Sequence, residues 1–201
     1  MGLRITSVLC LALFLAFSSC IHGLDINTAV SKYPEFSTFS SYLTQSKLVD
    51  QINGEKAITV LALGDDAASS FSGKPEDYVK LVLENHVITN YQDEKNLFSV
   101  VGSHEKLPTL SSSGIFVNLI NDGEVAFSAV DEKDKYESKL VRTVETQPGT
   151  VSILEVNKPI VSDDAAAAAT GDGKKVGGGS RAETGLFVGI FIALVSILTS
   201  L

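Results

Sequence analysis

Apolar stretches mark both ends of the chain, and the residues between them mix apolar and polar positions. Residues 8–17 (VLCLALFLAF) form a short apolar run behind Arg4, and residues 186–201 (LFVGIFIALVSILTSL) form an uncharged second one. A positive residue, a short apolar core and small residues near a cleavage point are typical of a secretory signal peptide. We therefore expect residues 1–23 to be a signal peptide that is cleaved after Gly23.

The second apolar run follows a row of small residues. At ~1.5 Å per residue a helix of this length spans roughly 24 Å, short of the ~30 Å hydrocarbon core of a bilayer. Small residues, a short polar spacer and an apolar tail are typical of a glycosylphosphatidylinositol (GPI) attachment signal, and a spanning or buried helix is the alternative. We expect residues 178–201 to be the GPI-attachment propeptide. The candidate lipid acceptors are Gly177, Gly178, Gly179 and Ser180, and the spacer length favours the first two.

The first half of the remaining chain has apolar residues mainly at helical spacing. Phe36, Phe39 and Leu43 share one helix face, and Pro75 suits the first turn of another helix. Helices are predicted at residues 36–43, 48–53, 75–83 and 93–101. Residues 57–63 (AITVLAL) are almost all apolar and predict a buried strand between the second and third of these helices.

The second half changes to the spacing of strands. Asp122-Gly123 separates two apolar runs, which is a strong signal for a β-hairpin. Strands are predicted at residues 106–110, 115–120, 124–130, 139–145 and 150–156. Helices followed by strands indicate the α+β class. Residues 24–161 are long enough for one domain, and residues 162–177, rich in Gly and Ala, predict a linker whose alanine run is too short for a stable helix alone.

Charge and cysteine content narrow the classes of function. The chain carries 16 Lys and Arg against 24 Asp and Glu, a net charge of −8, which argues against nucleic acid as a partner. Cys10 and Cys20 both lie in the expected signal peptide, so the mature chain has no thiol for a disulfide, a metal or a nucleophile.

Titratable residues show no catalytic or metal-binding spacing. His22, His86 and His104 form no pair at ligand spacing, and there is no nucleophile or phosphate-binding motif. Asp65 and Asp66 are adjacent, which favours a charged, solvated turn over acid–base catalysis. We expect no enzyme activity, no metal and no cofactor. His86, between an apolar helix and Val87-Ile88, is expected to be half-buried and to join a helix end to a strand, with a recognition role as the alternative.

The order of these segments resembles the fasciclin domain. Residues 59–67 (TVLALGDDA) are similar to its first signature box, residues 83–88 (LENHVI) to its central Tyr-His segment, and residues 151–161 to its closing box. Residues 107–110 and 123–127 are similar to the strands between. The residues that carry the likeness are Thr59, Val60, Asp65, Asp66, Asn85, His86, Ile153, Val156 and Pro159. Together with both processing signals, the chain resembles the plant fasciclin-like arabinogalactan proteins.

This resemblance implies a single fasciclin domain: a β-sandwich or wedge with packed N-terminal and central helices, whose first and last boxes pair in the core. It implies a GPI-anchored adhesion protein on the outer face of the plasma membrane. Its partners would be cell-surface or cell-wall proteins and polysaccharides, or copies of itself. A carrier or co-receptor for a small apolar ligand at the same membrane face is the alternative.

Two features depart from the family pattern. Asn85 stands where the family commonly has tyrosine, beside His86 as the family's histidine. None of the five prolines follows Ala, Ser or Thr, and the chain has no Asn-x-Ser/Thr sequence. We therefore expect a sparsely glycosylated member.

Overall fold

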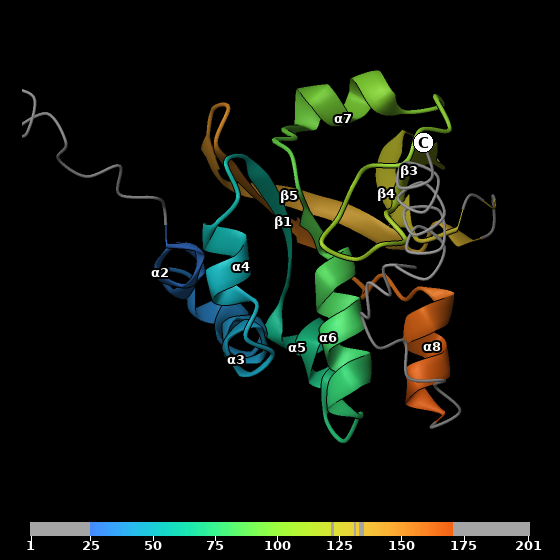
Figure 1. The fold of residues 1–201 in the computed structure, drawn as a ribbon. Coiled ribbons are helices and arrows are strands. Elements are labelled where there is room, and N and C mark those ends of the chain that lie inside the picture. The colour runs from blue at the N-terminus through green and yellow to red at the C-terminus, as the bar shows by residue number, and fades with distance from the viewer. Residues whose placement is uncertain (1–24, 122, 131, 133–134, 171–201) are drawn as a thin grey trace, which may run out of the picture.

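The computed structural model describes residues 25–170 except 122, 131 and 133–134. Six strands form one sheet in the order β2-β1-β6-β5-β4-β3, with helices packed around it (Figure 1). β1 (Ile58–Leu63) runs parallel to β6 (Val151–Val156), and all other neighbouring strands are antiparallel. The predicted α+β class is confirmed.

The two parallel strands form the centre of the core. Every residue of β1 is buried, and all of β6 except Glu155. A strand that is covered on both faces has a continuous run of apolar residues. For this reason the apolar run at residues 57–63 was enough to predict the buried strand. Val60 lies opposite Ile153, and Leu63 lies opposite Val156. The first and last signature boxes therefore pair, as the family resemblance implied.

Short helices precede the sheet at the N-terminal side. They are α2 (Ile26–Ser31), η1 (Pro34–Phe36), α3 (Ser37–Gln45) and α4 (Val49–Asn53). The spacing of Phe39 and Leu43 predicted α3 correctly, and both side chains are fully buried. α2 was not expected; its six residues are too few to show a periodic pattern. Asn53 fastens α2 to α4, because its Oδ1 accepts the backbone N–H of Ile26.

The central helices lead into β2, and the segment similar to the family's Tyr-His segment spans the end of α6 and this strand. They are α5 (Asp65–Ala68), η2 (Ser69–Phe71) and α6 (Glu76–Asn85), followed by β2 (Val87–Ile88). The predicted helix is present, but Pro75 is its N-cap residue and does not lie in its first turn. Val79, Val82 and Leu83 form its buried face, and Tyr78 and Leu81 are half-buried.

Asp93 is the N-cap of α7 (Glu94–Val100), and its side chain accepts the N–H of Asn96. Leu97 is fully buried, but Phe98 is 47% exposed. Phe98 points away from the core, since neighbours on a helix point about 100° apart. Only one of them can meet the core.

The remaining strands form antiparallel hairpins. β3 (Phe116–Ile120) pairs with β4 (Glu124–Ser128), which confirms the predicted hairpin. β5 (Ser138–Gln147) is long: most of it pairs with β6, and only Ser138 and Lys139 pair with β4. The sheet therefore curls into a wedge. Residues 106–110 do not form the expected strand but two isolated bridges, at Leu107 and Thr109; Pro108 between them has no N–H to donate.

The C-terminal end differs from the expected linker. Ser162 caps α8 (Asp163–Ala169) by accepting the N–H of Ala165. α8 lies beside α6 (Figure 1), and Ala165 is fully buried. The alanine run is too short to be stable alone, but packing against α6 stabilises it. Residues 163–169 therefore belong to the packed domain, and the expected linker does not begin at residue 162.

Candidate functional site

His86 is the centre of a buried network at the end of α6. Its imidazole is 0% exposed, Nδ1 lies 2.7 Å from the carbonyl oxygen of Leu61, and Nε2 accepts the N–H of Ile160 at 2.9 Å. Because Nε2 accepts, Nδ1 carries the proton and donates to Leu61. Burial lowers the pKa of His86 to about 4. A neutral imidazole thus joins α6, β1 and the closing segment, and it is fully rather than half-buried.

Asn85 extends the same network, and Thr59 of β1 makes a separate set of buried hydrogen bonds. Asn85 is fully buried, donates to the carbonyl of Ile160 at 3.4 Å and accepts from the Ser113 hydroxyl. Thr59 Oγ1 donates to the carbonyl of Asn90 and accepts the N–H of Gln92 at 2.7 Å. These side chains satisfy backbone groups inside the domain and present no atom to a partner. The family's tyrosine position is filled here by a small amide within the core.

Asp65 is part of the folded structure and not a freely solvated turn. Its carboxylate accepts the N–H of Thr38 at 2.8 Å and the Ser37 hydroxyl at 3.0 Å. The bond from the Thr38 N–H is the main cause that lowers the pKa of Asp65. Phe36, at the N-cap of α3, makes no side-chain cap, so Asp65 satisfies the first turn from a distance. Asp66 is exposed, and Pro159 is half-buried.

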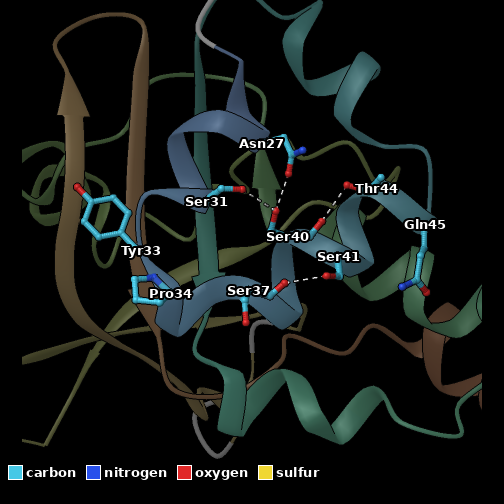
Figure 2. Close-up of a pocket in the computed structure, with 9 residues that line it drawn as sticks. All are labelled: Asn27, Ser31, Tyr33, Pro34, Ser37, Ser40, Ser41, Thr44 and Gln45. Atoms are coloured by element: carbon cyan, nitrogen blue, oxygen red, sulfur yellow. Dashed lines mark hydrogen bonds between the residues drawn. The ribbon is translucent and has the colours of Figure 1, made fainter.

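A groove lies along the outer side of α2, η1 and α3. Its volume is about 510 Å³. Nine residues line it, namely Asn27, Ser31, Tyr33, Pro34, Ser37, Ser40, Ser41, Thr44 and Gln45. In Figure 2, Tyr33 and Pro34 lie at one end, Gln45 at the other, and the serines between them. None of these side chains carries a charge, which distinguishes the groove from the acidic chain around it.

Hydrogen bonds hold the floor of the groove in place. Ser40 is 7% exposed and donates to Asn27 Oδ1, and its Oγ lies 3.4 Å from the Ser31 hydroxyl. Ser41 donates to the carbonyl of Ser37, and Thr44 to that of Ser40. Serine and threonine hydroxyls that bond one turn back on their own helix keep a defined orientation. The groove is a fixed, neutral surface rich in hydroxyl and amide groups.

The groove was missed by the sequence analysis, although a signal was present. Residues 37, 40, 41 and 44 all carry hydroxyls at the i, i+3, i+4, i+7 spacing of one helix face. The aromatic face of the same helix was recognised, and its polar face was not. The sequence of α3 alone could not predict that a groove forms there, because α2 and Tyr33 form its opposite wall.

Several expectations concern residues that the structure does not describe. The signal peptide and the lipid acceptors Gly177, Gly178, Gly179 and Ser180 lie outside the described residues. Among residues 25–170, less the four residues 122, 131 and 133–134, no helix is long and apolar enough to cross a membrane. Within the same residues no three His, Cys, Asp or Glu side chains are grouped to hold a metal ion.

Comparison with known proteins places these features in a family. The family model of the fasciclin domain matches residues 34–161. The chain is 36% identical over 171 residues to fasciclin-like arabinogalactan protein 3 of Arabidopsis thaliana, across 81% of this chain and 61% of that protein. It is 33% identical to fasciclin-like arabinogalactan protein 8 of the same plant, across 74% and 38%. The chain thus spans less than two thirds of the length of these curated relatives.

A solved structure shows the same fold. It is a FAS1 domain pair from the insect cell adhesion molecule Fasciclin I, which superposes with a TM-score of 0.51 at 13% identity. The match covers 63% of this chain and 45% of that one. At this identity the likeness concerns the fold alone. From the matched domain, the paired signature boxes and the plant relatives, this chain belongs to the fasciclin-domain family, with fasciclin-like arabinogalactan proteins among its relatives.

Proposed function

We propose that this chain is a GPI-anchored adhesion protein of the outer cell surface. Its fasciclin domain would contact cell-surface or cell-wall proteins and polysaccharides, or further copies of the chain. The observation that carries the proposal is the fasciclin domain at residues 34–161, which lies between a signal-peptide pattern and a GPI-attachment pattern. The relatives named above include Arabidopsis fasciclin-like arabinogalactan proteins.

The described fold suits passive display. The first and last boxes pair as parallel strands, and the His86 network ties α6 to both of them. Arg142 of β5 bonds to Glu155 of β6 and to Glu35 of η1, which joins the sheet to the N-terminal helices. A domain braced in this way presents a fixed surface, so it loses little conformational freedom when it binds.

The lipid anchor would allow many weak contacts between domain and partner to act together. A GPI anchor at Gly177 or Gly178 would hold many copies in one plane. Linked contacts raise avidity well above the affinity of each contact, provided that the geometry allows simultaneous engagement. Weak binding by a single domain is therefore compatible with firm adhesion between surfaces.

A bead assay tests the adhesive role directly. Fluorescent beads coated with residues 24–177 are mixed with uncoated beads, with each other, and with isolated wall material. We expect clustering or wall binding that rises steeply with coating density, because avidity depends on the number of linked contacts. Beads that remain single and unbound at every coating density would contradict the proposed function.

A further inference from the structure

We propose that the groove between α2, η1 and α3 binds an uncharged oligosaccharide, with one sugar ring packed against Tyr33. This inference rests on the proposed function, since it names a site and a ligand class for adhesion. It is carried by the composition of the lining, the fixed orientation of its polar groups and the absence of charge among the nine lining residues.

The lining has the chemistry that sugars require. Five of the nine residues carry aliphatic hydroxyls, and Asn27 and Gln45 carry amides. Hydroxyl and amide groups donate and accept hydrogen bonds, and the hydroxyls of a sugar do the same. A carboxylate only accepts and an ammonium only donates, so a charged groove would suit a charged ligand better than a neutral sugar.

The polar groups of the groove are ordered before a ligand arrives. The hydroxyls of Ser41 and Thr44 donate to backbone carbonyls, at 2.9 Å and 3.1 Å. Their lone pairs therefore have fixed directions in which to accept hydrogen bonds from a ligand. The Asn27 Oδ1 accepts from Ser40, while its Nδ2 has no hydrogen-bond partner among the described residues. Ordered donors and acceptors reduce the entropy that binding must remove.

Tyr33 supplies an apolar platform at one end of the groove. Its ring is half-buried and meets the Phe36 ring edge-on, with centroids 6.2 Å apart. Its hydroxyl donates to the carbonyl of Val144 at 3.4 Å, which limits rotation of the ring. Aromatic rings bury large apolar areas, and the C–H face of a pyranose offers such an area. Figure 2 shows the serines leading away from this ring toward Gln45.

Size and charge select the ligand class. α3 runs from Ser37 to Gln45, about 13.5 Å of helix, which suits more than one sugar ring. An acidic polysaccharide would meet a chain of net charge −8 with no cation in the groove. The structure therefore favours a neutral glycan chain over an anionic one.

The test is a titration of ¹⁵N-labelled residues 24–177 with cellohexaose, mannohexaose and an oligogalacturonate, followed by amide chemical shifts. We expect saturable shifts in α2, η1 and α3 with at least one neutral hexasaccharide, and none with the oligogalacturonate. Shifts confined to other elements, or equal binding of the acidic sugar, would overturn the inference. So would no shift with either neutral sugar at the highest concentrations reached.

Two variants and two matched controls locate the site. Ser41→Leu fills the groove at an exposed position where Leu is a better helix former than Ser, and Tyr33→Ala removes the platform. We expect each to weaken binding at least about tenfold. Ser99→Leu changes an exposed serine on α7 whose hydroxyl also bonds to its own helix, and Tyr91→Ala removes a half-buried ring outside the groove. Both controls should bind within about twofold of the parent.

The same variants separate this inference from the proposed function. If Ser41→Leu abolishes sugar binding and bead adhesion together, the groove is the adhesive site. If sugar binding is lost while bead adhesion to wall material is unchanged, the groove binds sugar but is not the adhesive site; the link between the groove and adhesion fails, and the proposed function stands. If the parent protein itself does not adhere, the proposed function fails.

Discussion

His86 makes the stability of the domain depend on pH. The buried imidazole has a pKa of about 4, against an ordinary value of 6.5. Between these values the unfolded chain holds more protons than the folded one, so stability falls as the pH falls. His86 therefore contributes fully above pH 6.5, and its contribution is lost as the pH approaches 4.

Replacement of His86 by a residue that does not titrate tests this dependence. We expect the free energy of unfolding of the parent protein, measured with urea, to drop by about 2 kcal/mol between pH 7 and pH 5. His86→Gln should be less stable at pH 7, because the hydrogen bonds to Leu61 and Ile160 are no longer well placed. Its free energy of unfolding should, however, fall clearly less between pH 7 and pH 5 than that of the parent. An equal loss in both proteins would show that another group causes the pH dependence.

Asp65 and Asp66 are neighbours with different surroundings. Asp65 satisfies the first turn of α3, whereas Asp66 is exposed and its carboxylate has no partner among the described residues. We expect Asp65→Ala to lower the free energy of unfolding by about 1 kcal/mol, as the loss of a helix cap does. Asp66→Ala, the matched control, should change it by less than about 0.5 kcal/mol. If urea unfolding shows the same loss of stability in Asp65→Ala and Asp66→Ala, Asp65 does not cap α3.

At the scale of elements, α8 shows how packing overrides local propensity. Its seven residues would not hold a helix in isolation, yet Ala165 is buried against α6. Ala166, the next residue, is exposed. The two positions carry the same side chain on the same helix and differ in burial, which makes them a matched pair.

We expect Ala165→Asp to detach α8, because a buried unpaired carboxylate is costly. Amide hydrogen exchange in residues 163–169 should become fast, and the melting temperature should fall. Ala166→Asp should leave both the exchange rates and the melting temperature close to those of the parent. Slow exchange in Ala165→Asp would mean that α8 does not depend on this contact.

The elements also show what a sequence can reveal. β1, α3, α6 and the β3–β4 hairpin were predictable, because buried runs, helical spacing and turn residues are local signals. α2 and α8 were not, because tertiary contacts hold short helices. The direction of Phe98 and the bridges at Leu107 and Thr109 depend on where the core lies. These features could be located only in the folded structure.

The candidate site was less predictable than the fold. The family resemblance directed attention to Asn85 and His86, which the structure places inside the domain. The groove arises where Tyr33 and the polar face of α3 meet α2, and no single segment carries that arrangement. Hydroxyls at helical spacing on residues 37–44 were visible in the sequence, but solvated helix faces commonly look the same.

At the scale of the whole molecule, the proposed adhesive function depends on where the fasciclin domain is displayed. α8 ends at Ala169, and the favoured lipid acceptors, Gly177 and Gly178, follow eight and nine residues later. A chain of n residues reaches at most about 3.6 Å × n, so the domain would stay near the membrane that holds it. Partners would then meet it on the cell surface.

Display by a GPI anchor is tested by treating intact cells with phosphatidylinositol-specific phospholipase C and analysing the released C-terminal peptide by mass spectrometry. We predict that the enzyme releases the protein, and that its last residue is Gly177 or Gly178 with the remnant of the lipid anchor attached. A mature protein that still carries Leu201, or one found in the cytosol, would contradict display by a GPI anchor and the adhesive function proposed with it.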